Sequence, residues 1–381
     1  MRKDFEYEFL GKKIVVETGE LAKQANGAVL VRYEDTVILS TAVMSNNVST
    51  ADFFPLTILY QEKLYSVGKI PGGFIKREGR PTDAATLTAR VIDRPIRPMF
   101  DENFRNEVQV VNTVLSVDND YTPEMTALFG TSLALGISSI PFDGPVAGVK
   151  VGKIDGVLKI NPTVEEMERS TIDLTVAGTK NAINMVESGS KEVSEEEMLE
   201  ALMFGHEYIK ELCAIQEDII NEVGKEKITV ELASLNPEIV KEVESDIKND
   251  MVMAIQIKDK LEKYAKIDEL KERAITNYTE KHAESETLES ELKQVKKIAD
   301  NIEGTEVRRL ITDEKVRPDG RGMTEIREFY KKRLTSKNSR KCIIYSWTNS
   351  STCNNYIRCF RWTSNTWWYY ARRREKIYVP L

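Results

Sequence analysis

The spacing of apolar residues changes near residue 236, and this change limits the fold more than any other feature of the chain. Before that point, apolar and polar residues alternate in short runs separated by turn residues, which is typical of hairpin strands. After Asn236 and Pro237, apolar residues recur at helical spacing, and no strand-like run appears before Leu310. The pattern predicts an α+β domain followed by an all-helical domain of roughly 70 residues.

Strands and helices alternate in the expected α+β part. The strand-like runs are Phe5–Leu10, Ile14–Gly19, Gly27–Arg32, Thr36–Val43, Leu56–Tyr60, Glu107–Val117, Gly148–Ile160 and Ile172–Ala177. Helices are expected from Thr82 to about Ile92, from Thr122 to about Ile137, and from Ser194 to Val223. In the helical part, one apolar face is marked by Ile239, Val240, Val243 and Ile247, and another by Leu261, Tyr264, Ile267 and Leu270.

The bulk composition excludes a membrane protein and a chain with a basic coat. The 381 residues are 41% hydrophobic and 30% charged, with a formal net charge of -7. No apolar run approaches the roughly eighteen residues that a membrane span needs, and the first residues lack the apolar core of a signal peptide. We therefore expect a soluble, cytoplasmic protein in which any nucleic-acid site is a local cluster of Arg and Lys.

A local cluster of this kind lies in the glycine-rich loop that starts at Gly68. Gly72 and Gly73 are expected to let the backbone turn tightly. The residues that follow are one aromatic side chain, for a base to stack on, and three cations for phosphates: Phe74, Lys76, Arg77 and Arg80. The loop is either a grip for single-stranded nucleic acid or an ordinary basic surface turn, and composition alone favours the turn.

Three arginines follow at helical spacing. Arg90, Arg94 and Arg97 fall along one side of the expected helix and its extension, together with Asp93. Pro95 and Pro98 predict that the helix ends near Asp93 or Arg94. One or two of the arginines could contact RNA, and for Arg94 and Arg97 the spacing leaves open a structural ion pair or a phosphate contact.

His206 and Cys213 lie on one face of the third helix, where a nucleophile or metal pair could be imagined. A lone His and a lone Cys on an amphipathic helix are more often packing residues, and we interpret them as such.

The last 48 residues differ sharply from the rest in composition. From Leu334 to Leu381 there are nine Lys or Arg against one acid, a net of +8, which leaves -15 for the preceding residues. All four tryptophans lie here, with three of the four cysteines: Cys342, Cys353 and Cys359. Their spacings of eleven and six residues match no paired zinc knuckle, so a zinc site is disfavoured.

Long motifs before this tail resemble those of the polynucleotide phosphorylase family. They are Thr18-Gly-Glu-Leu-Ala-Lys-Gln-Ala-Asn-Gly, the basic loop from Phe74, the run from Leu87 to Phe100, and Met185-Val-Glu-Ser-Gly-Ser-Lys-Glu-Val. The resemblance spans Met1 to about Arg327 and implies a first ribonuclease-PH-like core, a β-α fold like domain 2 of ribosomal protein S5.

The domains implied by the resemblance follow the change in pattern. The core would occupy residues 1–145 in its N-terminal part and 146–230 in its C-terminal part, with the all-helical domain at residues 236–312. Residues 313–330 would begin a second ribonuclease-PH-like core at Val316-Arg-Pro-Asp-Gly-Arg-Gly, and residues 331–381 would be a disordered, out-of-frame tail.

The resemblance also implies a function. The family degrades single-stranded RNA from its 3′ end by phosphorolysis, with inorganic phosphate as co-substrate and magnesium as cofactor, and releases nucleoside diphosphates during mRNA turnover. Family members form ring-shaped homotrimers whose channel entrance corresponds to Phe74, Lys76, Arg77 and Arg80. The catalytic, phosphate-binding and metal-binding residues lie in the second core, so we expect no catalytic or metal site here and little or no activity. The KH and OB-type domains that normally follow are expected to be absent as well.

A change of reading frame explains the tail. Codons that can encode Cys342-Ile-Ile-Tyr-Ser-Trp-Thr-Asn-Ser-Ser also encode Ala-Leu-Phe-Thr-Arg-Gly-Gln-Thr-Gln when read one base later, which resembles a motif of the family's second core. The same shift at Leu334 permits Leu-Leu-Pro-Arg-Thr-His, the motif expected just before it. Lys331-Lys-Arg could be encoded by an adenine run, which places the switch between Arg327 and Leu334.

Two rival interpretations belong to other classes. The chain could be a non-catalytic module for binding single-stranded RNA or for oligomerisation. The Arg- and Trp-rich tail could instead be a nucleic-acid arm, because Arg and aromatic residues can clamp a strand. The second rival is disfavoured, since the tail carries no turn or strand context.

Overall fold

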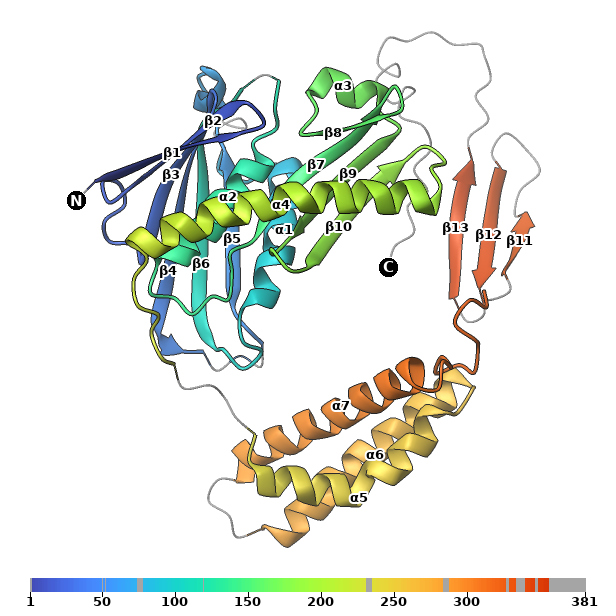
Figure 1. Ribbon diagram of the computed structural model, residues 1–381. Coiled ribbons are helices and arrows are strands. Elements are labelled where there is room, and N and C mark those ends of the chain that lie inside the picture. Colours follow the sequence, from blue (N-terminus) through green and yellow to red (C-terminus); the bar gives the residue numbers. More distant parts are fainter. Residues whose placement is uncertain are drawn as a thin grey trace. The chain divides into compact units, whose positions relative to one another are not determined.

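The computed structural model describes residues 2–49, 51, 53–73, 78–118, 120–230, 235–283, 288–326, 329–333, 340–346 and 349–355. The chain divides into two compact units, Met1–Ser234 and Leu235–Leu381 (Figure 1). No helix in the described ranges is both long and apolar enough to cross a membrane.

The first unit contains a six-stranded sheet in the order β1-β2-β3-β4-β6-β5. Its strands are β1 (Lys3–Phe9), β2 (Lys12–Thr18), β3 (Gly27–Tyr33), β4 (Thr36–Val48), β5 (Leu56–Glu62) and β6 (Asn106–Ser116). Neighbours pair antiparallel, except that β5 runs parallel to β6 with Leu56 opposite Val108. These strands confirm the runs predicted from alternation.

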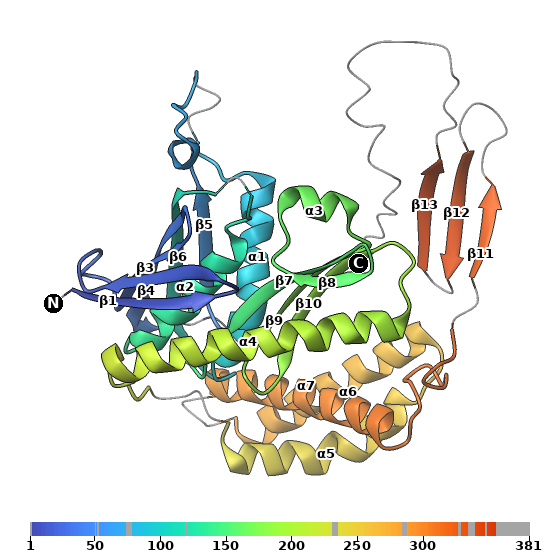
Figure 2. The same cartoon turned by 45° about the horizontal axis from the view of Figure 1, so that its top comes forward.

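A four-stranded antiparallel sheet follows, in the order β10-β9-β7-β8. Its strands are β7 (Ala147–Ile154), β8 (Val157–Ile160), β9 (Ile172–Gly178) and β10 (Ile183–Ser190). The single strand predicted over residues 148–160 is instead a hairpin, because Asp155 and Gly156 adopt left-handed φ angles of +50° and +85° and reverse the chain. The short helix α3 (Val164–Arg169), which lies near β7 and β8 in Figure 2, was also not predicted.

Three longer helices cover the sheets: α1 (Asp83–Ile96), α2 (Glu124–Ile137) and α4 (Glu195–Val223). Every residue of α2 from Ala127 to Ile137 is buried, and α2 contacts strands of both sheets. Helix α4 runs along both sheets in Figure 1 and contacts β1, β7, β8 and β9. Its start is fixed by a capping box between Ser194 and Glu197. Both sheets, α1, α2 and α4 share one hydrophobic core.

Helix α1 continues past the end predicted from its prolines. Pro95 lies inside the helix, which runs to Ile96 and is followed by a short 3-10 turn, Arg97–Met99. A proline removes one helical hydrogen bond and crowds the carbonyl group one turn earlier. Here Pro95 and Ile96 are buried in the core, and this burial keeps the last turn helical.

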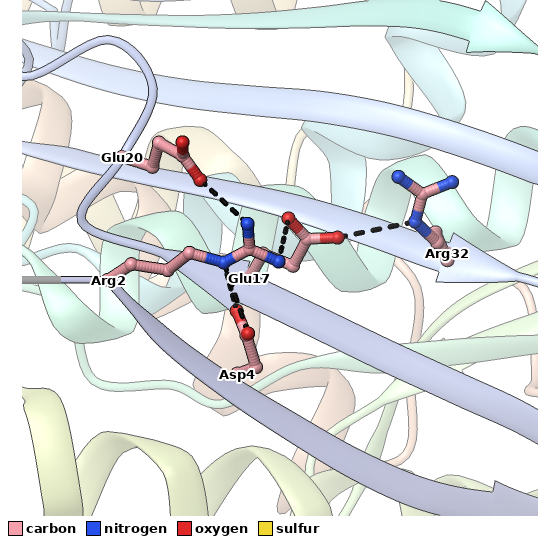
Figure 3. Close-up of polar contacts among 5 residues, drawn as sticks. All are labelled: Arg2, Asp4, Glu17, Glu20 and Arg32. Carbon is pink, nitrogen blue, oxygen red and sulfur yellow. Dashed lines mark hydrogen bonds and ion pairs between the residues drawn. The ribbon is translucent and has the colours of Figure 1, made fainter.

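Ion pairs bridge the edge of the six-stranded sheet that β1 forms (Figure 3). Arg2 pairs with Asp4 at 2.8 Å, Glu20 at 3.0 Å and Glu17 at 3.2 Å, and Glu17 also pairs with Arg32 at 3.3 Å. Glu17 is the most shielded member, with 15% of its side chain exposed, and it joins β2 to both cations. Charged side chains on an edge strand oppose pairing with another chain.

The second unit contains the helices α5 (Pro237–Ile255), α6 (Lys260–Lys281) and α7 (Leu288–Thr312) around their own core. Ile239, Val243 and Ile247 are buried, as predicted. The face predicted for α6 is partly wrong: Ile267 and Leu270 are buried, but Leu261 is 76% exposed and Tyr264 is 50% exposed. At about 100° per residue, nine residues turn Leu261 to the side opposite Leu270.

The end of the described chain contains a turn and three strands. Val316 and Gly322 form a bridge around a turn in which Gly320 has φ +83°. Strands β11 (Phe329–Arg333), β12 (Arg340–Ser346) and β13 (Asn349–Asn355) then pair antiparallel. The other residues of the segment 331–381, which the sequence predicts to be disordered, lie outside the described ranges.

Candidate nucleic-acid interface

The basic loop between β5 and α1 is closed at its base by Glu78. The Oε1 atom of Glu78 accepts a hydrogen bond of 2.5 Å from the N–H of Leu64, and the Lys63 ammonium donates to the Glu78 carbonyl oxygen at 3.1 Å. Glu78 has a left-handed φ of +56°, which is uncommon outside glycine. The two ends of the loop are therefore held together at one point.

The tight turn of the loop lies earlier than the sequence predicted. A 3-10 turn, Leu64–Val67, ends at Gly68, whose φ is +68° and whose N–H donates to the Tyr65 carbonyl oxygen at 3.0 Å. Gly72 and Gly73 are exposed and have no positive φ, so they do not supply the left-handed turn.

Of the four loop residues predicted to bind nucleic acid, the structure describes only Arg80. Phe74, Lys76 and Arg77 lie outside the described residues. Arg80 is exposed and makes no hydrogen bond or ion pair within the described ranges. Its guanidinium therefore has its donors open to solvent or to an anion.

Helix α1 carries the next two arginines outward. Thr82 caps it by accepting a hydrogen bond of 3.1 Å from the N–H of Ala85, and the buried face includes Thr88 and Ile92. Arg90 is exposed and, like Arg80, has no polar partner among the described residues. Arg94 is exposed and pairs with Glu187 of β10 at 3.0 Å, a pairing that is weak at a solvated surface.

Arg97 is committed to the fold. Its guanidinium donates to both carboxylate oxygens of Asp93, at 2.9 and 2.8 Å, and to the carbonyl oxygens of Phe54 at 3.0 Å and Leu56 at 3.1 Å. These bonds tie the end of α1 to the start of β5 and use four of the five N–H donors of the group. Of the two alternatives that the spacing left open, the geometry favours the structural one.

Sequence reasoning missed exposed side chains next to the loop. Tyr65 is 51% exposed and Ile70 is 91% exposed, and Leu87 on α1 is also exposed. An exposed aromatic ring beside basic residues is suited to stacking on a base. The signal was present, because Tyr65 lies between Lys63 and Lys69 in the sequence.

His206 and Cys213 are packing residues, as interpreted from the sequence. The Nε2 atom of His206 lies 3.0 Å from the carbonyl oxygen of Thr179, and Cys213 is fully buried. Burial raises the pKa of the Cys213 thiol to about 12, so the thiolate is not formed near neutral pH. Over the described ranges, no three His, Cys, Asp or Glu side chains are placed to hold a metal ion. No magnesium ligand is assigned to this chain.

Family models match most of the described chain in three consecutive segments. Residues 11–141 match domain 1 of the 3′ exoribonuclease family, and residues 144–208 match its domain 2. Residues 238–322 match the RNA binding domain of polyribonucleotide nucleotidyltransferase. The third segment covers the helical unit and the turn at Gly320.

Curated relatives agree with these models. The chain is 59% identical to a polyribonucleotide nucleotidyltransferase of Enterococcus faecalis over 317 residues, and 59% identical to one of Anoxybacillus flavithermus over 323 residues. A Streptococcus pneumoniae protein of the same name is 55% identical over 323 residues. These matches cover 83% to 85% of this chain and 44% to 45% of each relative, so the chain spans less than half of their length.

Replacing Arg97 separates a structural role from an RNA contact. We expect Arg97→Ala to lower the free energy of unfolding of residues 1–234 by about 1–3 kcal/mol, because the partly buried carboxylate of Asp93 and carbonyl groups of Phe54 and Leu56 lose their partner. Arg90→Ala is the matched control and should change it by less than about 0.5 kcal/mol. Urea unfolding followed by circular dichroism measures both. If both variants change the free energy of unfolding by a similar, negligible amount, the hydrogen bonds of Arg97 do not stabilise the fold, and its structural role is contradicted.

Proposed function

Because residues 11–322 belong to the polyribonucleotide nucleotidyltransferase family, we propose that the chain serves 3′-to-5′ phosphorolytic degradation of single-stranded RNA by guiding the RNA. In this proposal the full enzyme attacks the terminal phosphodiester with inorganic phosphate, releases nucleoside diphosphates and acts in mRNA turnover in the cytoplasm. The observation that carries it is the anchored basic loop beside α1, within the segment that matches the exoribonuclease family.

The described cations beside the loop support this role. Arg80 and Arg90 have no competing acid in the described ranges, so a phosphate can take their donors without breaking an ion pair. Tyr65 offers an exposed ring at the loop's base. We propose Phe74, Lys76 and Arg77 as further contacts on the sequence evidence alone.

Arg94 and Arg97, the other two arginines predicted from the sequence, differ in role. Arg94 can contribute by exchanging its exposed partner Glu187 for phosphate. Arg97 acts by positioning α1 against β5, as its hydrogen bonds to Phe54 and Leu56 indicate.

The chemistry is proposed to reside in a second core rather than in these residues. Magnesium would stabilise charge that develops on the scissile phosphate, and Arg and Ser groups would hold the attacking phosphate. The chain's own contribution is to bind and orient the RNA strand, and we propose that this chain by itself has little or no phosphorolytic activity.

The changed composition after Leu334 is proposed to result from a frame switch between Arg327 and Leu334. Matches to the curated relatives extend over 317 to 323 of the 381 residues, which supports a switch near this point. Sequencing the gene across these codons is expected to find an adenine run at Lys331-Lys-Arg. An intact frame without a homopolymer would contradict the proposal.

The main alternative is a non-catalytic module that binds single-stranded RNA or mediates oligomerisation, such as homotrimer formation. The match of residues 238–322 to an RNA binding domain favours the RNA-binding form of this alternative. The two functions differ in phosphate-dependent turnover by the complete protein.

Salt dependence tests the proposed phosphate contacts. In anisotropy titrations of labelled oligo(A), we expect Arg80→Ala and Arg90→Ala each to weaken binding and to reduce the slope of log K against log salt by about 0.7, the value for one phosphate contact on a single strand. Arg32→Ala is the control, since Arg32 lies on β3, away from β5, and pairs with Glu17 of β2. Slopes unchanged by both loop-side variants would place the RNA elsewhere.

A further inference from the structure

A hollow lined by aromatic rings lies away from the basic loop. It has a volume of about 450 Å³ and is bounded by the β1–β2 turn, the end of β3, the segment before α2, β8 and α4. Its lining residues are Leu10, Lys12, Tyr33, Tyr121, Leu158, Lys159, Ile160, Asn161, Phe204 and Tyr208. The volume falls within the range of small-molecule sites, about 300–1,000 Å³.

A second hollow adjoins the first and deepens it. Both are lined by Tyr33, Tyr121 and Asn161, and the second reaches an apolar floor that includes Phe9 and Phe129. An apolar floor below polar walls is the usual composition of a site for a small ligand with a flat apolar part.

The rings that line the hollow are held by one another. Phe9 lies 6.5 Å from Tyr33 and 6.2 Å from Tyr208, measured between ring centroids, and Phe204 lies 5.3 Å from Tyr208 at an interplanar angle of 71°. Edge and tilted contacts of this kind are favourable, so the walls are already formed without a ligand. A preformed aromatic wall reduces the entropy lost on binding a planar group.

The cation in this hollow has no acidic partner. The Nζ atom of Lys12 lies 3.3 Å from the centroid of the Tyr121 ring and 5.7 Å from that of Tyr33, and it forms no ion pair within the described ranges. Its neighbour Lys13 differs, because it pairs with Glu6 at 2.8 Å. Lys159 is also neutralised, by Glu166 at 2.5 Å. Lys12 therefore supplies the uncompensated positive charge at the aromatic wall.

Asn161 adds directed hydrogen-bond donors. Its Oδ1 atom accepts from the N–H of Lys150 at 3.0 Å, and its own N–H donates to the Lys150 carbonyl oxygen at 2.7 Å. These bonds fix the residue with a left-handed φ of +44°. The Nδ2 group has no partner in the described part of the chain, so its two N–H donors remain for a ligand.

We propose that this hollow binds a free nucleotide, with the base among the tyrosine rings, an acceptor on the base at Asn161 Nδ2, and a phosphate on Lys12. A planar base can stack on the rings, and a phosphate can pair with the unpaired ammonium group of Lys12. An uncharged aromatic compound would make only the first contact, and an aliphatic acid only the second. The site is separate from the proposed RNA-guiding surface, because its residues come from neither the loop at residues 63–80 nor α1.

Calorimetric titration of the 381-residue chain with ADP tests the proposal. We expect saturable binding of ADP and much weaker binding of adenosine and of inorganic phosphate, because each lacks one of the two recognition elements. Lys12→Met should weaken ADP binding about tenfold or more, the loss expected for a hydrogen bond between charged groups. Lys13→Met, one residue away and paired with Glu6, should leave it unchanged. Absence of ADP binding at millimolar concentration, or equal effects of the two lysine variants, would overturn the proposal.

Two further variants separate the ring from the fold and the hollow from the RNA surface. Tyr121→Phe should keep ADP affinity within about twofold and Tyr121→Leu should lower it, since the ring is what is required; thermal unfolding reports whether each variant is folded. If Tyr121→Leu does not fold, Lys12→Met decides the outcome. The double variant Arg80→Ala, Arg90→Ala should bind ADP as the unaltered chain does. Loss of ADP binding in that variant would assign the nucleotide to the loop surface instead and would contradict the proposal.

Discussion

The burial of α2 on every side is the constraint on which the first unit depends. A helix that is apolar all round must be covered all round, and the two sheets, α1 and α4 provide that cover. Strand β3 approaches α2 so closely that a Cβ atom added at Gly27 would lie 2.1 Å from the carbonyl oxygen of Ala134. Such contact leaves no room for a ligand at the centre. The loop after β5 and the aromatic hollow therefore lie at the margins of the core, where side chains are free to meet other molecules.

Electrostatic contacts in this unit divide into those that hold the fold and those left open. Glu78 and Arg97 are used internally: the first closes the base of the loop, and the second fixes α1 to β5. Arg80, Arg90 and Lys12 have no acidic partner in the described ranges, although the chain carries a net charge of -7. In a chain with excess acid, unpaired cations beside exposed or half-buried rings are the groups best placed to bind phosphate and base together.

The strands and long helices could be predicted from the sequence, because alternation and capping residues are local signals. Sequence reasoning missed β10, where Met185 is the only buried residue and the alternation of apolar and polar residues is therefore weak. It also merged β7 with β8, although Asp155-Gly156 between two apolar runs is a typical hairpin signal. For Arg97, the sequence left open a structural ion pair or a phosphate contact. It could not decide between them, because the carbonyl groups of Phe54 and Leu56 are over 40 residues away in the chain. The hollow was also out of reach, because Lys12, Tyr121 and Tyr208 meet only through tertiary packing.

Phosphorolysis by the purified 381-residue chain tests the central claim most directly. Labelled poly(A), magnesium and inorganic phosphate would be incubated with the chain, and release of ADP followed over time against a control without phosphate. We expect RNA to be bound but no ADP to be released above the control. Release of ADP at an enzyme-like rate, about 1 per second or faster, would show that residues of this chain carry the chemistry and would contradict the assignment of an RNA-guiding role alone.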